Sequence, residues 1–176
     1  MSLNSIESQL KGGHPNSLGN TVEVVDSVVS SESSLEDLFA CYKSNDEVVR
    51  LRVSNAMKRI AKARKTLLLP YLDRFIDEIG ELDQASAQWT LAQLFLVYTE
   101  DLSGDQHEAA LKIMKRNLEN HSDWIVLNQT MKTLTEWSKW DENLKEWLIP
   151  RLKTLSTDDR KSVAKTSSKC LAGLSA

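Results

Sequence analysis

Proline and glycine are scarce in this 176-residue chain, which contains 3 prolines and 6 glycines. Turn-rich β folds need one of these residues at most chain reversals, so their scarcity disfavours an all-β protein. Long apolar runs are also missing, because runs such as residues 66–70 are far shorter than the roughly 20 residues that cross a bilayer. The N-terminus lacks the charged start and apolar centre of a signal peptide. We therefore expect a cytoplasmic protein without a membrane partner.

Neither sign of charge dominates, because 25 acidic residues stand against 22 basic ones and give a net charge of −3. Such a chain has no overall field that attracts nucleic acid, which is a disfavoured partner. Cysteine is rare, and Cys41 and Cys170 are 129 positions apart without metal-ligating neighbours. We expect both to be buried thiols in a reducing compartment, with a disulfide or a reactive thiol as the alternative.

Catalytic and metal-binding motifs are missing as well. His14, His107 and His121 are isolated, and none has a second histidine four residues away around a glutamate, as a zinc-binding helix would. The sequence contains no Gly-rich phosphate loop and no nucleophile motif. Adjacent acids such as Asp77 and Glu78 point to different helix faces and are poorly placed to act as a pair. We predict no metal, no cofactor, no catalytic residue and no enzymatic activity.

The first 33 residues differ from the rest of the chain. Nine serines fall within residues 2–34, two adjacent glycines and a proline interrupt the segment, and aromatic residues are absent. This composition is typical of a flexible tail, with room for one short helical turn at residues 22–29. We predict a flexible Ser-rich tail over residues 1–33 and a folded domain over residues 34–176.

From Ser34 onward, apolar residues recur every three to four positions, which is the period of an amphipathic helix. Asp46 and Asp123 stand where a helix would begin and are good N-caps. Phe75 and Leu94 lie on apolar stripes and are predicted core residues. The eight predicted helices cover residues 35–43, 46–64, 68–79, 106–119 and 141–155, and three segments that begin after Asp83, Asp123 and Thr157.

A repeat runs through these helices. Paired in chain order, the second helix of each pair carries a polar anchor soon after its start. The four anchors are Arg50, Gln88, Asn128 and Lys165, at spacings of 38, 40 and 37 residues. The first helices repeat too, because Pro70 recurs as Pro150 two periods later. A period of 37–40 residues with two helices is typical of stacked helical repeats. In such a stack, each helix pair buries against its neighbours the apolar surface that it would leave exposed alone.

The first anchor helix resembles those of the HEAT-repeat family, because it opens with Asp46-x-x-Val49-Arg50. Prolines in the first helices and aspartates at the turns are two further marks. The resemblance covers residues 34–175 as about four degenerate repeats. It implies a right-handed α-α superhelix of the armadillo type, with eight helices in four antiparallel pairs. It also implies a concave face, lined by the second helices, that binds protein partners.

Basic residues cluster in one stretch. Residues 50–70 hold seven lysines and arginines and no acid, whereas residues 71–108 hold nine acids and the single base Arg74. One interpretation is a solvated helix end whose cations favour the helix dipole and pair with the acidic segment that follows. The other is a basic strip that grips an acidic peptide or a phosphate backbone. Arg59 and Lys62, three positions apart on one helix face, are the candidate partner-binding residues of this strip.

Five tryptophans are the other unusual feature, and most are expected in the core or between repeats. Trp137 stands two periods after Arg59, which lies off the apolar stripe of its helix. Trp89 corresponds in register to Leu51, which lies beside that stripe. We predict that Trp89 and Trp137 face the groove, where tryptophan is a favoured anchor for a partner.

These observations predict a non-enzymatic, monomeric interaction scaffold that binds a protein or peptide partner along its concave face. One alternative is a HEAT-like DNA glycosylase or another nucleic-acid-binding protein. Trp140-Asp141 fits a glycosylase, which also uses tryptophans, an acid and a basic groove, but the acidic overall charge and the short chain disfavour it. A third reading is a bilin-lyase-like HEAT protein that acts on a chromophore.

Overall fold

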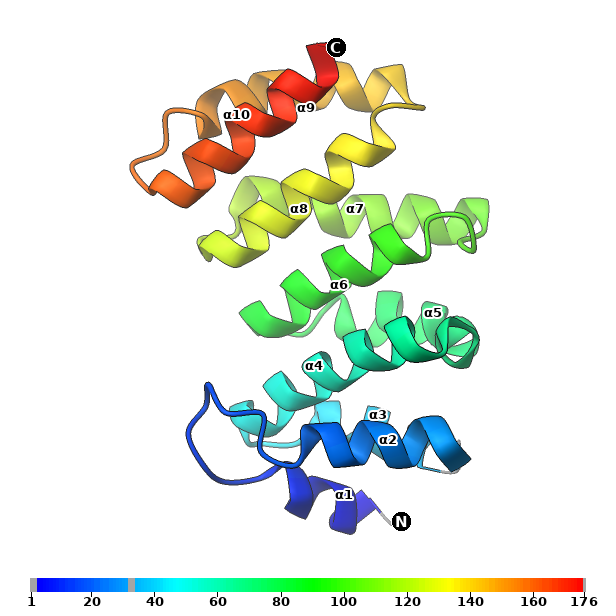
Figure 1. Ribbon diagram of the computed structural model, residues 1–176. Coiled ribbons are helices and arrows are strands. Elements are labelled where there is room, and N and C mark those ends of the chain that lie inside the picture. Colours follow the sequence, from blue (N-terminus) through cyan, green and yellow to red (C-terminus); the bar gives the residue numbers. More distant parts are fainter. Residues whose placement is uncertain (1–2, 32–33, 176) are drawn as a thin grey trace. The chain divides into compact units, whose positions relative to one another are not determined.

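The computed structural model describes residues 3–31 and 34–175, in which helices make up 78% and no strand occurs. The predicted all-α class is therefore confirmed. The chain divides into two compact units, Met1–Thr90 (unit 1) and Leu91–Ala176 (unit 2). Their boundary falls inside helix α6, Ala85–Val97. The helices are labelled in Figure 1.

Unit 1 opens with two helices, α1 (Leu3–Leu10) and α2 (Thr21–Ser31), where a flexible tail was predicted. The prediction of a flexible tail is wrong for α1 and for the loop after it, whereas the short helical turn predicted at residues 22–29 lies within α2. Residues 1–2 and 32–33 of the predicted tail lie outside the described residues. Both helices carry apolar side chains that are fully buried, among them Ile6, Leu10, Val24 and Val28. Helix α1 contacts α3 and α4, and α2 contacts α4, so these stripes belong to the core of unit 1.

The loop between α1 and α2 wraps around the guanidinium of Arg52, which is only 1% exposed. Gly12, Gly13 and Gly19 have positive φ angles, a backbone conformation that favours glycine. Arg52 donates hydrogen bonds to four backbone carbonyl oxygens, those of Leu10 (2.7 Å), Gly12 (2.6 Å), His14 (3.2 Å) and Ser17 (3.1 Å). The loop composition that suggested a tail thus belongs to a fixed turn around a buried cation.

The remainder of unit 1 follows the predicted helices, with one break. Helix α3 (Leu35–Ala40) continues into a 3₁₀ turn (Cys41–Lys43). Helix α4 (Glu47–Ala63) begins where it was predicted, because the side chain of Asp46 accepts from Val48 N at 2.9 Å.

The segment predicted as one regular helix over residues 68–79 instead consists of three short helical segments of different kinds. These are a 3₁₀ segment (Lys65–Tyr71), the short α5 (Leu72–Arg74) and a π-helical turn (Phe75–Ile79). Pro70 lies inside the 3₁₀ segment, and a proline has no N–H for a regular α-helical ladder. Phe75 is 1% exposed, so its predicted place in the core is confirmed.

Unit 2 contains the end of α6 and four further helices, α7 (Gly104–Asn120), α8 (Trp124–Trp137), α9 (Glu142–Leu155) and α10 (Lys161–Ser175). The Asp123 side chain caps α8, as predicted, by accepting from Ile125 N and Val126 N. Helix α10 begins later than predicted, because Thr157 instead donates to Thr154 O at the end of α9. Helices α8 and α10 lie side by side, with α7 and α9 behind them (Figure 1).

The repeat anchors make corresponding contacts in the two units. In unit 1, Arg50 donates to the side-chain oxygen of Gln84, which lies 34 residues later at the start of α6. In unit 2, Asn128 donates to Ser162 Oγ at 2.7 Å, again 34 residues later, at the start of α10. Within each unit, therefore, one predicted anchor links the first turn of its helix to the start of a later helix.

Candidate functional site

The four residues predicted to bind a partner do not form one patch. Arg59 and Lys62 are exposed near the end of α4, and Arg59 Nε donates to Asn55 Oδ1 at 2.7 Å. Trp89 is half-buried in α6 and lines a separate groove of about 330 Å³ together with Leu51. Leu51 precedes Arg59 by eight residues of helix, a rise of about 12 Å. The structure therefore separates Trp89 from the Arg59–Lys62 pair within unit 1.

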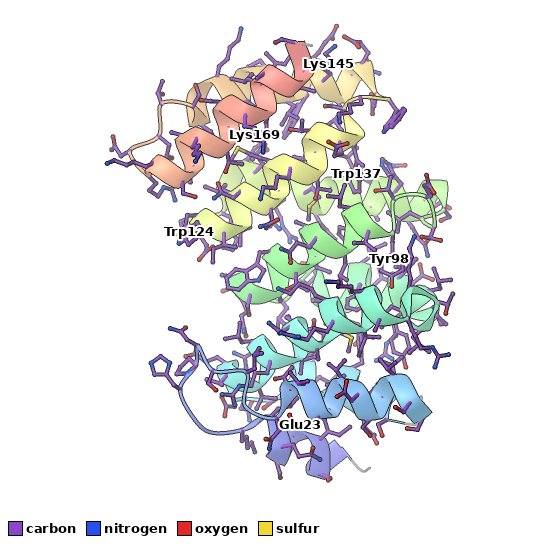
Figure 2. All side chains as sticks on the ribbon, in the orientation of Figure 1. Glu23, Tyr98, Trp124, Trp137, Lys145 and Lys169 are labelled. Atoms are coloured by element: carbon purple, nitrogen blue, oxygen red, sulfur yellow. The ribbon has the colours of Figure 1, made fainter. Side chains whose placement is uncertain are left out.

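Trp137 is buried, with 2% exposure, so the prediction that it anchors a partner in a groove is wrong. Its Nε1 donates to Thr99 Oγ1 at 2.9 Å, and its ring centre lies 4.4 Å from that of His107. Trp137 follows the buried Leu134 by three positions, which places both on the core face of α8. Figure 2 labels Trp137 at the C-terminal end of α8.

The exposed tryptophans are Trp140, at 83%, and Trp124, at 49%. Trp124 is labelled at the opposite end of α8 from Trp137 in Figure 2. Hydrophobic periodicity favours core positions for tryptophan, and no sequence pattern marks these two side chains at helix ends as exposed.

Three of the seven basic residues in the run that suggested a binding strip donate to backbone carbonyls of unit 1. Arg52 holds the α1–α2 loop as described above. Arg50 Nη1 donates to Ser44 O at 2.6 Å, and Arg64 Nη1 donates to Val29 O at 2.8 Å. Burial, with a smaller contribution from the nearby Arg59, lowers the pKa of Lys58. Arg59 and Lys62 are exposed, whereas the three arginines that donate to carbonyl oxygens have a structural role.

A groove in unit 2 gathers lysines that the sequence did not single out. It has a volume of about 640 Å³ and is formed by α8 and α10, with one side chain from α6. We call it the α8–α10 groove. Its lining residues are Leu96, Lys132, Thr135, Glu136, Lys139, Lys165, Thr166, Lys169, Cys170 and Gly173.

Three of the four lysines in this groove keep an unneutralised charge. Lys139 is paired with Glu136 at 2.7 Å. Lys132, Lys165 and Lys169 are exposed, and none forms an ion pair within residues 3–31 and 34–175. Lys169 is labelled on α10 in Figure 2.

The remaining side chains make the groove partly apolar. The Cys170 side chain is 7% exposed. This burial raises the pKa of its thiol, so the thiol is uncharged at neutral pH. Leu96 is 37% exposed and adds apolar surface, and Gly173 leaves its part of the wall open. The α8–α10 groove thus combines free positive charge with an apolar floor.

The lysines occupy matching places in the repeat. Lys132 and Lys169 each follow their anchors, Asn128 and Lys165, by four positions. Helix α10 also has Lys161, so lysines recur every four residues along it, and it contains no acid. Like charges four residues apart destabilise a helix by about 0.2–0.5 kcal/mol for each pair. The lysine spacing of this last helix is the signal that sequence reasoning missed.

Other types of site find no support within the described part of the chain. No group of three or more histidine, cysteine or acidic side chains is placed to hold a metal ion there. No helix of that part has both the length and the apolar character needed to cross a membrane. Comparisons with protein-family models and with curated proteins find no match for this chain.

Proposed function

We propose that this chain is a non-enzymatic interaction scaffold of the HEAT-repeat type, which binds a segment of a partner protein along the surface of its second helices. The observation that carries the proposal is the α8–α10 groove. It is large enough for several side chains of a ligand, since binding pockets commonly have volumes of about 300–1,000 Å³. Its walls are formed by two second helices of the proposed repeat.

The repeat register adds support for the HEAT-type assignment. Arg50 and Asn128 make the same contact, 34 residues forward, in units 1 and 2. Gln88, the anchor between them in sequence, donates to the carbonyl oxygens of Ile79 (3.1 Å) and Leu82 (2.8 Å) in the turn before its own helix. Arg50 does the same with Ser44. Four anchored pairs stacked as a superhelix are the arrangement we propose.

The proposal includes a cytoplasmic location, and the cysteines accord with it. Cys41 and Cys170 are both free thiols and buried, as predicted. Free cysteines are common in reducing compartments and uncommon in secreted proteins.

The test is a selection of displayed random peptides on the purified protein, followed by two variants of one position. A side chain added at Gly173 meets no atom within 4 Å, so substitutions there fit without a clash. Gly173→Phe fills part of the α8–α10 groove, whereas Gly173→Ala is the matched control that leaves it open. We expect selected peptides to bind the wild type and Gly173→Ala alike, and Gly173→Phe at least about tenfold more weakly.

The result that contradicts the proposed function is equally direct. Either no peptide is enriched over an unrelated protein, or the enriched peptides bind Gly173→Phe as tightly as Gly173→Ala. Thermal melting of both variants shows that each is folded, so a loss of binding reports on the groove.

A further inference from the structure

The charges of the α8–α10 groove point to the chemistry of its occupant. Resting on the proposed function, we infer that the groove binds an extended acidic peptide segment, with carboxylates two residues apart and an apolar side chain between them. The free cations come from both walls, Lys132 from α8 and Lys165 and Lys169 from α10. A ligand that enters this groove meets positive charge on both sides.

The spacing of the lysines matches an extended chain. Lys165 and Lys169 are one helical turn apart on α10, a rise of about 6 Å. In an extended peptide, side chains on one face recur every second residue, at about 6.6–6.8 Å. Carboxylates at alternate positions of the ligand therefore reach successive lysines of this wall.

The floor of the groove accounts for the apolar side chain of the ligand. Leu96 and the neutral Cys170 thiol offer contacts without charge, and the open position of Gly173 leaves space beside them. A purely acidic segment would leave this surface in contact with water. An aspartate or glutamate pair with leucine or valine between them covers both the charged rim and the apolar floor.

Nucleic acid fits this groove less well than an acidic peptide. No aromatic side chain lines the groove, so it lacks the stacking platforms on which single-stranded bases bind. Residues 91–176 contain 12 basic and 12 acidic residues, so unit 2 has no excess positive charge to attract a phosphate backbone. All four cations of the groove are lysines, without the forked guanidinium that favours phosphate oxygens.

The inference is tested with three fluorescein-labelled probes, each titrated against the full chain by fluorescence anisotropy. The first is a peptide of alternating glutamate and leucine, and the second has glutamine in place of each glutamate. The third is a single-stranded oligothymidylate with the charge of the first. We expect the glutamate peptide to bind at least about tenfold more tightly than the glutamine peptide, and more tightly than the oligothymidylate. Its binding should weaken as the salt is raised from about 0.05 M to about 0.5 M, because screening reduces exposed charge pairs.

Two double variants with the same change in net charge locate the binding. The double variant Lys165→Glu with Lys169→Glu replaces both positive charges on the α10 wall of the groove with negative ones. Lys153→Glu with Lys161→Glu is the matched control, since both lysines are exposed and neither lines the groove. For the glutamate peptide, we expect the groove variant to lose about tenfold or more in affinity and the control to stay within about twofold.

Four results overturn the inference. They are equal binding of the two peptides, binding of neither peptide, equal losses in the two double variants, and tighter binding of the oligothymidylate. A glutamine peptide that binds as well as the glutamate peptide, and is blocked by Gly173→Phe, would leave the proposed function standing without the acidic ligand. Binding by neither peptide overturns the inference, and the peptide selection then decides the proposed function separately.

Discussion

Three arginines of unit 1 and the free lysines of the α8–α10 groove in unit 2 differ in their partners. In unit 1, Arg52 is buried and donates to four carbonyl oxygens, and Arg50 and Arg64 also turn to backbone carbonyls. In unit 2, Lys132 and Lys169 extend into solvent beside a groove.

The residue types explain this difference. A guanidinium presents several donors in a planar fork and is weakly hydrated, so it can satisfy a ring of carbonyls in the interior. An ammonium is compact and strongly hydrated and stays in water unless a partner replaces that water. A basic run read from sequence therefore says little about binding until the partners of each cation are known.

The strongest test of this comparison is Arg52→Ala. The variant leaves four loop carbonyls without their donor and a cavity where the guanidinium was. We expect the free energy of unfolding to fall by on the order of 3–5 kcal/mol, as when one partner of a buried charged network is removed. Urea denaturation followed by circular dichroism gives the value. The matched control is Arg59→Ala on the same helix, which should change it by less than about 0.5 kcal/mol because that side chain is exposed. Equal effects in the two variants would show that Arg52 is not the centre of the α1–α2 loop.

A second test compares two tryptophans of unit 2. Trp137→Phe removes the hydrogen bond to Thr99 and leaves a small cavity in a packed site, so we expect a loss of about 1–3 kcal/mol. Trp140→Phe changes an exposed ring and should alter stability by less than about 0.5 kcal/mol. Thermal melts of both variants decide between burial and exposure. A smaller loss of stability in Trp137→Phe than in Trp140→Phe would mean that the Trp137 side chain lies in a groove and not in the core.

Alanine substitutions of two glycines, one in each unit, are expected to change the free energy of unfolding in opposite directions. Gly19 has a φ of +52°, and a Cβ there would lie 3.1 Å from Cζ of Arg52, which its carbonyl partners hold in place. We expect Gly19→Ala to cost about 1–2 kcal/mol from the left-handed backbone alone. Gly173 lies in helix α10 with open space around it, so Gly173→Ala should stabilise the protein by up to about 1 kcal/mol. Chemical denaturation of the pair provides the check, and a change of the same sign in both would refute the tight loop around Arg52.

The smallest expected effect concerns Arg59 and Lys62, which the sequence analysis predicted to bind a partner. Arg59→Glu with Lys62→Glu should leave the affinity for the glutamate peptide within about twofold of wild type, since neither side chain lines the α8–α10 groove and single exposed charges contribute weakly. Anisotropy titrations of this variant, run beside the Lys165→Glu and Lys169→Glu variant, provide the comparison. A larger loss from the α4 substitutions would restore the basic strip of unit 1 as the binding site.

Much of the helical pattern could be predicted from local residues. Asp46 and Asp123 start α4 and α8 as predicted, because an N-cap and an apolar stripe act within a few residues. Phe75 and Leu94 are buried for the same reason. Helix α1 was missed, and α2 was predicted only as a short turn, because their apolar stripes are short and the loop between them is rich in glycine. What fixes that loop is Arg52, 35 to 42 residues further along the chain, and no local rule reveals such a contact.

The candidate site was less predictable than the fold. The lysine spacing in α10 can be read from the sequence, but it also suits a solvated terminal helix. Only the packing of α10 against α8 brings Lys132 to the opposite wall. Three lysines of the groove have no carboxylate partner among the residues that the structure describes. Burial of Trp137 likewise depends on Thr99 and His107, side chains from other parts of unit 2.

The most direct measurement is a chemical-shift titration of the ¹⁵N-labelled chain with the glutamate peptide. The account predicts that the amide shifts which change with peptide concentration concentrate in α8 and α10 around Lys132, Lys165 and Lys169, and at Leu96. Amides near Arg59 and Lys62 on α4 should stay unchanged. Perturbations centred on that part of α4, with α8 and α10 silent, would contradict the account and assign binding to the basic run of unit 1.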